Sequence, residues 1–203
     1  MPNHVTNKVE IAGPKESIQA IKDQLMTEES QFDFETLIPT PDGLKDTVAP
    51  FRGTEEESAA LKKEYGYDNW YQWRCTMWGT KWNSYEVYWE DEIHPIGSTY
   101  KTGVQFDTAW STPAPIIEAL AKAYPNVTIR VCYADEDIGS NFGEYMYGHN
   151  AEPIFFIQYE FEDLESCEAA RETLFDVQPI AEEAWDEKTG KFDWENFWDA
   201  DTE

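Results

Sequence analysis

The feature of this 203-residue chain that most constrains its fold is a strand-helix-strand pattern that occurs twice. Each copy has a strand, then a helix with apolar residues at three- and four-residue spacing, and then a second strand. The first copy is predicted at 7–12, 15–27 and 32–38, and the second at 104–110, 113–124 and 127–133. Two such units placed side by side form one sheet with both helices on the same face.

Prolines mark the helix ends in both copies. Pro14 precedes the first helix, and Pro113 follows Thr112 at the start of the second, where a missing N–H has no cost. Pro125 ends the second helix, because proline cannot continue one. The predicted fold class is therefore α+β, a ferredoxin-like split βαβ sandwich.

Further parts surround this core. An insertion at about residues 40–101 contains a charged helix at 55–65 and a tryptophan-rich stretch, which predicts a largely helical insertion. Segments 141–149 and 153–161 are predicted to be strands that extend the sheet. We expect a ferredoxin-like domain at residues 1–162 and an acidic helical extension at 163–203. The extension has a helix at 164–174 and aromatic residues that would dock its tail.

The charge is large and uneven. The net charge is −26, and residues 135–203 hold 21 Asp/Glu against 3 Lys/Arg, a net of −18. Such a surface repels nucleic acid and anionic membranes, and it attracts basic proteins. The alternative is that the charge only keeps the protein soluble. An aromatic content of 15% argues for a packed core, because disordered acidic chains lack aromatic residues.

The tryptophan-rich stretch supplies the densest set of candidate binding residues: Trp70, Trp73, Arg74, Trp78, Lys81 and Trp82. Tryptophan and arginine contribute much of the binding energy at protein interfaces, so these side chains could form a recognition platform. Alternatively the rings attach the insertion to the sheet, because an insertion needs a core of its own. The strong tendency of large rings to be buried favours this alternative.

Three consecutive acids, Asp135, Glu136 and Asp137, follow a predicted strand and are also candidate binding residues. Clustered carboxylates can bind Ca²⁺ or Mg²⁺, but this spacing does not match an EF-hand loop, so no metal site is expected. The three cysteines lack zinc-ligand spacing and are expected to be reduced and buried. We also expect no cofactor and no catalytic residue, because no nucleophile, phosphate-loop or dinucleotide motif is present.

Three segments resemble the YubB-like family of phage- and plasmid-borne proteins. They are the start MPN followed by KVEIAG, the block WYQWRCTMWGTKWN at 70–83, and FDTAWSTPAPIIEALAKAYPNVTIRVCYADED at 106–137. That family has aromatic and cysteine residues after MPN, where this chain has His4, Val5 and Thr6. The resemblance implies a ferredoxin-like fold and a mobile-element origin. It implies no activity and no functional residue.

Two functional hypotheses follow. In the first, the protein is an interaction protein that imitates a polyanion and so blocks a basic host protein, such as a restriction or CRISPR-type nuclease complex. In the second, it binds a small molecule, or is an enzyme, at the open sheet face or in a cleft between the sheet and the insertion. That cleft would be lined by Trp78, Lys81, Trp82 and Trp89.

RNA binding through the sheet is a third possibility that the sequence argues against. The charge has the wrong sign, and no RNP motif is present. The N-terminus has no apolar signal core, and no apolar stretch approaches 18 residues. We therefore expect a cytoplasmic protein of a bacterial host cell, with neither membrane nor nucleic acid as a direct partner.

Overall fold

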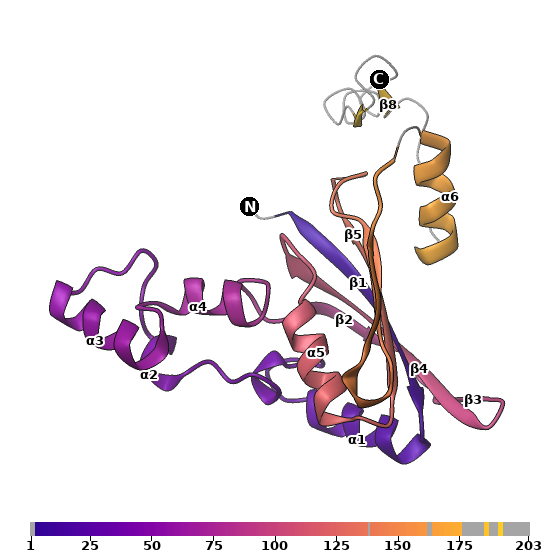
Figure 1. Ribbon diagram of the computed structural model, residues 1–203, viewed down its shortest axis with the longest axis horizontal. Coiled ribbons are helices and arrows are strands. Elements are labelled where there is room, and N and C mark those ends of the chain that lie inside the picture. Colours follow the sequence, from indigo (N-terminus) through magenta and orange to yellow (C-terminus); the bar gives the residue numbers. More distant parts are fainter. Residues whose placement is uncertain (1–2, 138, 162–163, 176–184, 187–190, 193–203) are drawn as a thin grey trace.

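The computed structural model describes residues 3–137, 139–161, 164–175, 185–186 and 191–192 (Figure 1). Within the predicted tail, two short strands are described, β8 (Trp185–Asp186) and β9 (Lys191–Phe192), and they pair with each other. The expected docking of the tail's aromatic residues lies outside the described residues.

The main sheet confirms the predicted fold class. Its path runs β2-β4-β1-β5-β6-β7, every neighbouring pair is antiparallel, and a short strand also pairs with β4. The strands are β1 (His4–Gly13), β2 (Tyr85–Trp89), β3 (His94–Ile96), β4 (Thr99–Ala109), β5 (Thr128–Asp135), β6 (Gly143–Tyr147) and β7 (Pro153–Gln158). In the central part, β2-β4-β1-β5, the two strand-helix-strand units interleave as in a ferredoxin-like fold.

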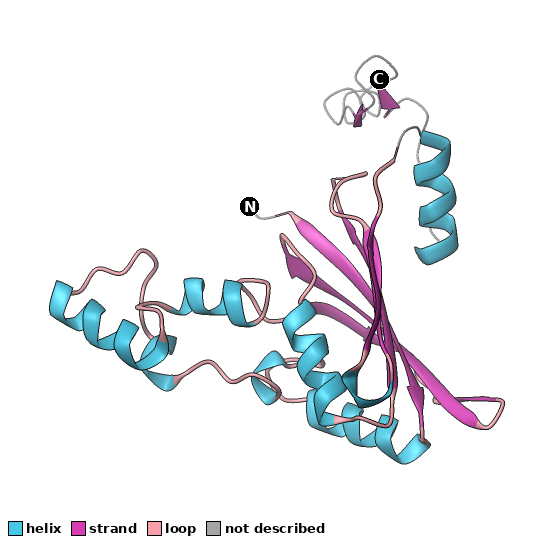
Figure 2. Cartoon of the chain, in the orientation of Figure 1, coloured by secondary structure: helices cyan, strands magenta, loops and turns pink. Residues whose placement is uncertain are grey.

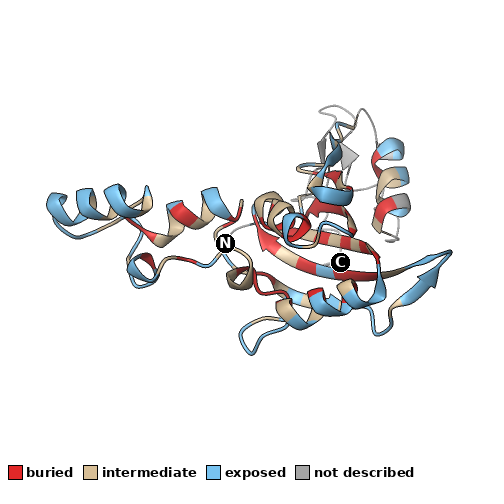
Figure 3. Ribbon diagram, turned by 60° about the horizontal axis from the view of Figure 1, so that its bottom comes forward, coloured by how far each residue is buried: buried red, intermediate tan, exposed pale blue. Residues whose placement is uncertain are grey.

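The main core lies between this sheet and two helices, α1 (Lys15–Leu25) and α5 (Ala114–Ala123), on one of its faces (Figure 2). Alternate residues of β1 are buried, as expected of a strand with one face against a core. Helix α1 buries Ile18, Ile21 and Leu25, which recur at helical spacing. Figure 3 shows this burial concentrated in the strands.

The strand predicted at 32–38 is wrong. This segment contains a short 3₁₀ helix, η1 (Phe34–Thr36), and joins no sheet. The Asp33 carboxylate accepts hydrogen bonds from the Glu35 N–H, the Thr27 hydroxyl and the Asn83 amide, and such local bonds compete with strand pairing. Its place in the sheet is taken by β2, which lies inside the range 40–101 expected to be insertion.

Residues 40–83 form an extension that we call the arm, which reaches away from the sheet (Figure 1). It carries α2 (Asp42–Lys45), α3 (Glu55–Tyr65) and α4 (Trp70–Met77). Helix α3 begins with a capping box between Thr54 and Glu57 and ends at Gly66, whose φ of 83° suits glycine. No residue of α3 is buried, so this helix depends on its caps, on the partly buried Leu61 and Tyr65, and on the bonds of Ser58 and Lys62 to Asp68.

The C-terminal elements extend the domain in two ways. Strands β6 and β7 lengthen the sheet, which confirms the two strands predicted there. Helix α6 (Leu164–Phe175) confirms the predicted helix and lies on the opposite side of the sheet from α1 and α5 (Figure 1). It packs Cys167 and Leu174 towards the sheet, where Cys132, Ala134 and Phe142 form a second, smaller core.

Candidate functional site

The structure separates the six predicted aromatic and basic residues into a buried and an exposed group. Trp73 and Trp78 are buried, and Trp78 has no exposed surface. The Trp78 ring packs edge-on against the Phe34 ring, with 5.6 Å between the ring centres. The indole N–H of Trp78 donates to the Ile38 carbonyl at 2.8 Å. These two rings attach the arm to the core, so they present nothing to a partner, and Trp78 cannot line the predicted cleft.

Arg74 belongs to the buried group as well. Its guanidinium forms an ion pair with Glu35 at 2.9 Å and donates to the Thr40 hydroxyl at 3.0 Å. It also lies 4.3 Å from the centre of the Trp78 ring and 5.5 Å from that of Trp70. Burial lowers the pKa of Arg74, an effect that the Glu35 carboxylate opposes. Arg74 therefore stabilises the base of the arm and is not free to bind a ligand.

The other group, half-buried or exposed, contributes to an aromatic hollow, which we define as the surface made by Trp70, Tyr71, Lys81, Trp82 and Trp110. The Lys81 ammonium lies 3.9 Å from the ring centre of Trp82 and 4.0 Å from that of Trp110, within cation–π distance of both rings. Trp82 is 40% exposed and Trp110 is 45% exposed. A cavity of about 540 Å³ opens beside Trp70, Lys81 and Trp82.

Trp110 and Tyr71 are the members of this hollow that the sequence analysis missed, and Trp110 is the more informative of the two. It was predicted to end a strand, whereas it follows β4 with φ of 72°, a left-handed conformation that is rare for a bulky residue. Its N–H donates to the Asn3 carbonyl at 3.0 Å, which holds the turn in place. No local signal marks this turn, because the strained residue is neither glycine nor asparagine.

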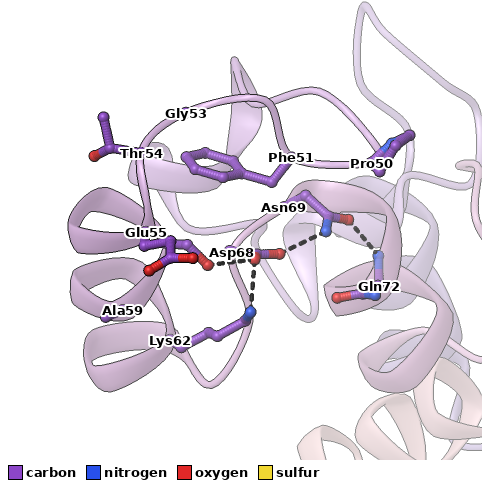
Figure 4. Close-up of a pocket in the computed structure, with 11 residues that line it drawn as sticks. Pro50, Phe51, Gly53, Thr54, Glu55, Ala59, Lys62, Asp68, Asn69 and Gln72 are labelled. Atoms are coloured by element: carbon purple, nitrogen blue, oxygen red, sulfur yellow. Dashed lines mark hydrogen bonds and ion pairs between the residues drawn. The ribbon is translucent and has the colours of Figure 1, made fainter.

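A second cavity, of about 570 Å³, lies between α3 and the start of α4 (Figure 4). Its most connected side chain is Asp68, which accepts hydrogen bonds from Ser58 at 2.7 Å and Asn69 at 2.8 Å and pairs with Lys62 at 2.8 Å. These bonds, with the one from Lys62 foremost, lower the pKa of Asp68 to about 2. The charges at this cavity are thus engaged with each other, and they fix α3 against α4.

The three consecutive acids do not act as a unit. Asp135 is buried and accepts hydrogen bonds from the side chains of Asn3 and Asn141 and from the backbone N–H of Asp137. Glu136 is exposed and accepts the backbone N–H of His4 at 2.9 Å. Within the described part of the chain, no three His, Cys, Asp or Glu side chains are grouped as metal ligands would be.

The cysteines and the Tyr85–His4 pair are not arranged for catalysis. All three cysteines are free, and burial raises the pKa of Cys132 and of Cys167 to about 11, so both thiols are protonated at neutral pH. The Tyr85 hydroxyl shares a hydrogen bond of 2.9 Å with the His4 ring, and burial, with the carboxylates of Asp107 and Glu136, raises the Tyr85 pKa to about 12. Neither the thiols of Cys132 and Cys167 nor the Tyr85 hydroxyl is arranged as an activated nucleophile.

Sequence reasoning also missed a cavity of about 240 Å³ between α6 and the open face of the sheet. Arg171 and Phe175 of α6 line it, together with Thr6 of β1, Gln105 of β4 and the acids Asp135 and Glu136. No pattern in the sequence links these residues, because they come from four elements that meet only when α6 folds over the sheet.

Comparison with known proteins bears on the fold of this chain. Residues 84–178 match the family model described as "Ferredoxin-like domain in Api92-like protein". The matched segment is a ferredoxin-like domain. It spans β2 to α6, the part of the chain that contains most of the sheet. Among the described residues, no helix is long and apolar enough to cross a membrane.

The solved structures include one match, the crystal structure of protein api92 from Yersinia pseudotuberculosis. It is 9% identical, has a TM-score of 0.49, and covers 79% of this chain and 99% of that one. A similarity of this size supports no inference about this chain. The search of curated proteins found no match.

Proposed function

We propose that this protein is an interaction protein that binds a partner with a basic surface by presenting carboxylates where that partner would otherwise meet phosphates. The observation that carries the proposal is a stripe of acids on α6. Glu165, Glu168 and Glu172 recur at i, i+3 and i+7, which places them on one face of the helix over two turns. Glu165 and Glu172 are exposed and Glu168 is half-buried.

The opposite face of α6 makes this stripe rigid. Cys167 and Leu174 are buried, and Ala170 packs against the same small core. The backbone of the stripe is therefore held, and only the side-chain ends can move. A fixed array of like charges binds a complementary surface better than a flexible one, because less conformational entropy is lost on binding.

The surroundings of the stripe add to its field. Residues 84–178 contain 18 Asp/Glu and 4 Lys/Arg, a net of −14. Three of those four bases are already paired: Lys122 with Glu118, Lys101 with Glu10, and Arg130 with Glu10 and Glu144. The surplus of acids would attract a basic protein and speed its association, most strongly at low salt.

The identity of the partner is a further part of the proposal. A nucleic-acid-binding protein of a bacterial host, such as a restriction or CRISPR-type nuclease complex, has the basic groove that a carboxylate array would fill. The proposal also includes a phage or plasmid origin, a counter-defence role and a cytoplasmic site of action. They depend on the resemblance to the YubB-like family and on the charge.

The test is capture from a bacterial lysate at low salt, followed by competition with double-stranded DNA. The triple variant Glu165→Gln, Glu168→Gln, Glu172→Gln should lose about tenfold in affinity, since each exposed charge contributes about 0.5 kcal/mol. The matched control is Glu55→Gln, Glu56→Gln, Glu64→Gln on α3, which removes the same charge and should bind normally.

The expected partner is basic, and both salt and DNA release it. The proposal is overturned if nothing basic is captured, if the captured protein resists both salt and DNA, or if the two triple variants bind equally well.

A further inference from the structure

The cavity beneath α6 is lined by a cation, Arg171, that lacks an ion-pair partner among the described residues. Arg171 is half-buried, and its Nε atom is buried without a hydrogen-bond partner. Among the described residues no carboxylate forms an ion pair with it, although the chain carries 41 Asp/Glu. A buried N–H donor that lacks an acceptor costs folding free energy, so an acceptor supplied from outside would bind at this guanidinium favourably.

Another part of the wall of this cavity is negatively charged. Glu136 lines it with an exposed carboxylate, of which Oε1 accepts the His4 backbone N–H. Asp135 also lines the cavity, but its two oxygens already accept three hydrogen bonds. Glu136, which is exposed and accepts one hydrogen bond, is therefore the acid with more accepting capacity left for a ligand. Arg171 and Glu136 do not pair with each other, and so each can bind a charge of opposite sign.

The size and walls of the cavity narrow the class of ligand. Its volume of about 240 Å³ is below the roughly 300–1,000 Å³ typical of drug-sized sites. Thr6 and Gln105 contribute polar groups, and Phe175 contributes an apolar wall. A small molecule with one anionic end, one cationic end and a short apolar part would match these features.

We propose that this cavity binds a small zwitterion of the α-amino acid class. Arg171 pairs with the ligand carboxylate through its planar donors, and Glu136 accepts from the ligand ammonium. Simple dianions such as phosphate are disfavoured, because Glu136 and Asp135 would repel them. None of Glu165, Glu168 and Glu172 lines this cavity, so the site shares no residue with the proposed protein-binding stripe.

The experiment measures thermal shifts of the full chain with each of the twenty standard α-amino acids, followed by calorimetry for those that raise the melting temperature. At least one amino acid should stabilise the protein. Its des-amino acid and its decarboxylated amine should each bind at least about tenfold more weakly, because each lacks one charged contact.

Variants assign the contacts. Arg171→Gln and Glu136→Gln should each weaken binding at least about tenfold. Glu172→Gln, on the outer face of α6, should leave it within about twofold. If Arg171→Gln does not fold, Arg171→Lys retains the charge but loses the planar fork, and it should also bind more weakly.

Several results would overturn the proposal. These are the absence of any stabilising amino acid, equal binding of the des-amino acid, binding unaffected by both Arg171 variants, or inorganic phosphate binding as tightly as the best amino acid. Binding that depends on Arg171 and Glu136 but not on Glu172 supports it.

Discussion

The arm and the sheet domain of this protein use their side chains in opposite ways. The arm, residues 40–83, has 7 Asp/Glu and 6 Lys/Arg and is almost neutral, whereas residues 84–178 carry a net charge of −14. The arm contains four of the nine tryptophans, of which Trp73 and Trp78 attach it to the core. The sheet domain builds its core from alternating strand residues, and most of its described acids are exposed, with Asp135 and Glu144 buried.

This contrast bears on the meaning of the charge. A charge that served only solubility would fall on both regions, since both have surface exposed to water. Instead the arm balances its acids with bases, whereas the domain that has the rigid core does not. Some charges of the arm are held in ion pairs, Lys62 with Asp68 inside the arm and Arg74 with Glu35 at its base. The contributions of the two regions can therefore be tested separately.

The largest expected effect comes from Trp78, which joins the two regions. Trp78→Ala should lower the free energy of unfolding by about 3–5 kcal/mol, because it empties a buried site and leaves the Ile38 carbonyl without its donor. Trp82→Ala, at an exposed ring, should cost about 1 kcal/mol or less. Chemical denaturation followed by circular dichroism measures both. Equal losses would mean that the arm is not anchored through Trp78.

A smaller effect is expected at Asp68, inside the arm. Asp68→Asn should cost about 1–3 kcal/mol, because Lys62 and Ser58 lose a charged acceptor. The control is Asp46→Asn, an exposed acid of the arm.

The same residue predicts a dependence on pH. The pKa of Asp68 in the folded protein, about 2, is below the usual 3.8, so its stabilisation is complete above pH 3.8 and disappears as the pH falls through 2. Wild-type stability should therefore fall over this range more steeply than that of Asp68→Asn. Parallel curves would contradict the network drawn in Figure 4.

The smallest effect is expected at the aromatic hollow. Lys81→Met removes a cation that lies over two rings, and it should destabilise the protein by about 0.5–1 kcal/mol while changing the tryptophan fluorescence. Lys63→Met, at an exposed site on α3, serves as the control and should change neither. An unchanged fluorescence spectrum in Lys81→Met would show that the ammonium does not rest on these rings.

Much of the fold could be predicted from local patterns. The helices at α1, α3, α5 and α6 and the strands at β1, β5, β6 and β7 follow from apolar spacing and from the prolines that bound them. The segment 32–38 has the same kind of pattern, yet Asp33 uses its carboxylate for local bonds and the segment leaves the sheet. The strand that replaces it, β2, lies in the tryptophan-rich stretch. The many aromatic residues of that stretch obscure the alternating pattern of the strand.

The sequence by itself determined most of the helices and strands, how the charge divides along the chain, and that a two-layer α+β fold can bury the apolar residues. Those properties depend on neighbours within a few positions. Only the tertiary structure decided which tryptophans are buried, that Trp110 joins Lys81 and Trp82, and that Arg171 meets Thr6 and Glu136 beneath α6. These contacts join residues far apart in the chain, and they exist only because packing, which no local spacing encodes, brings their elements together.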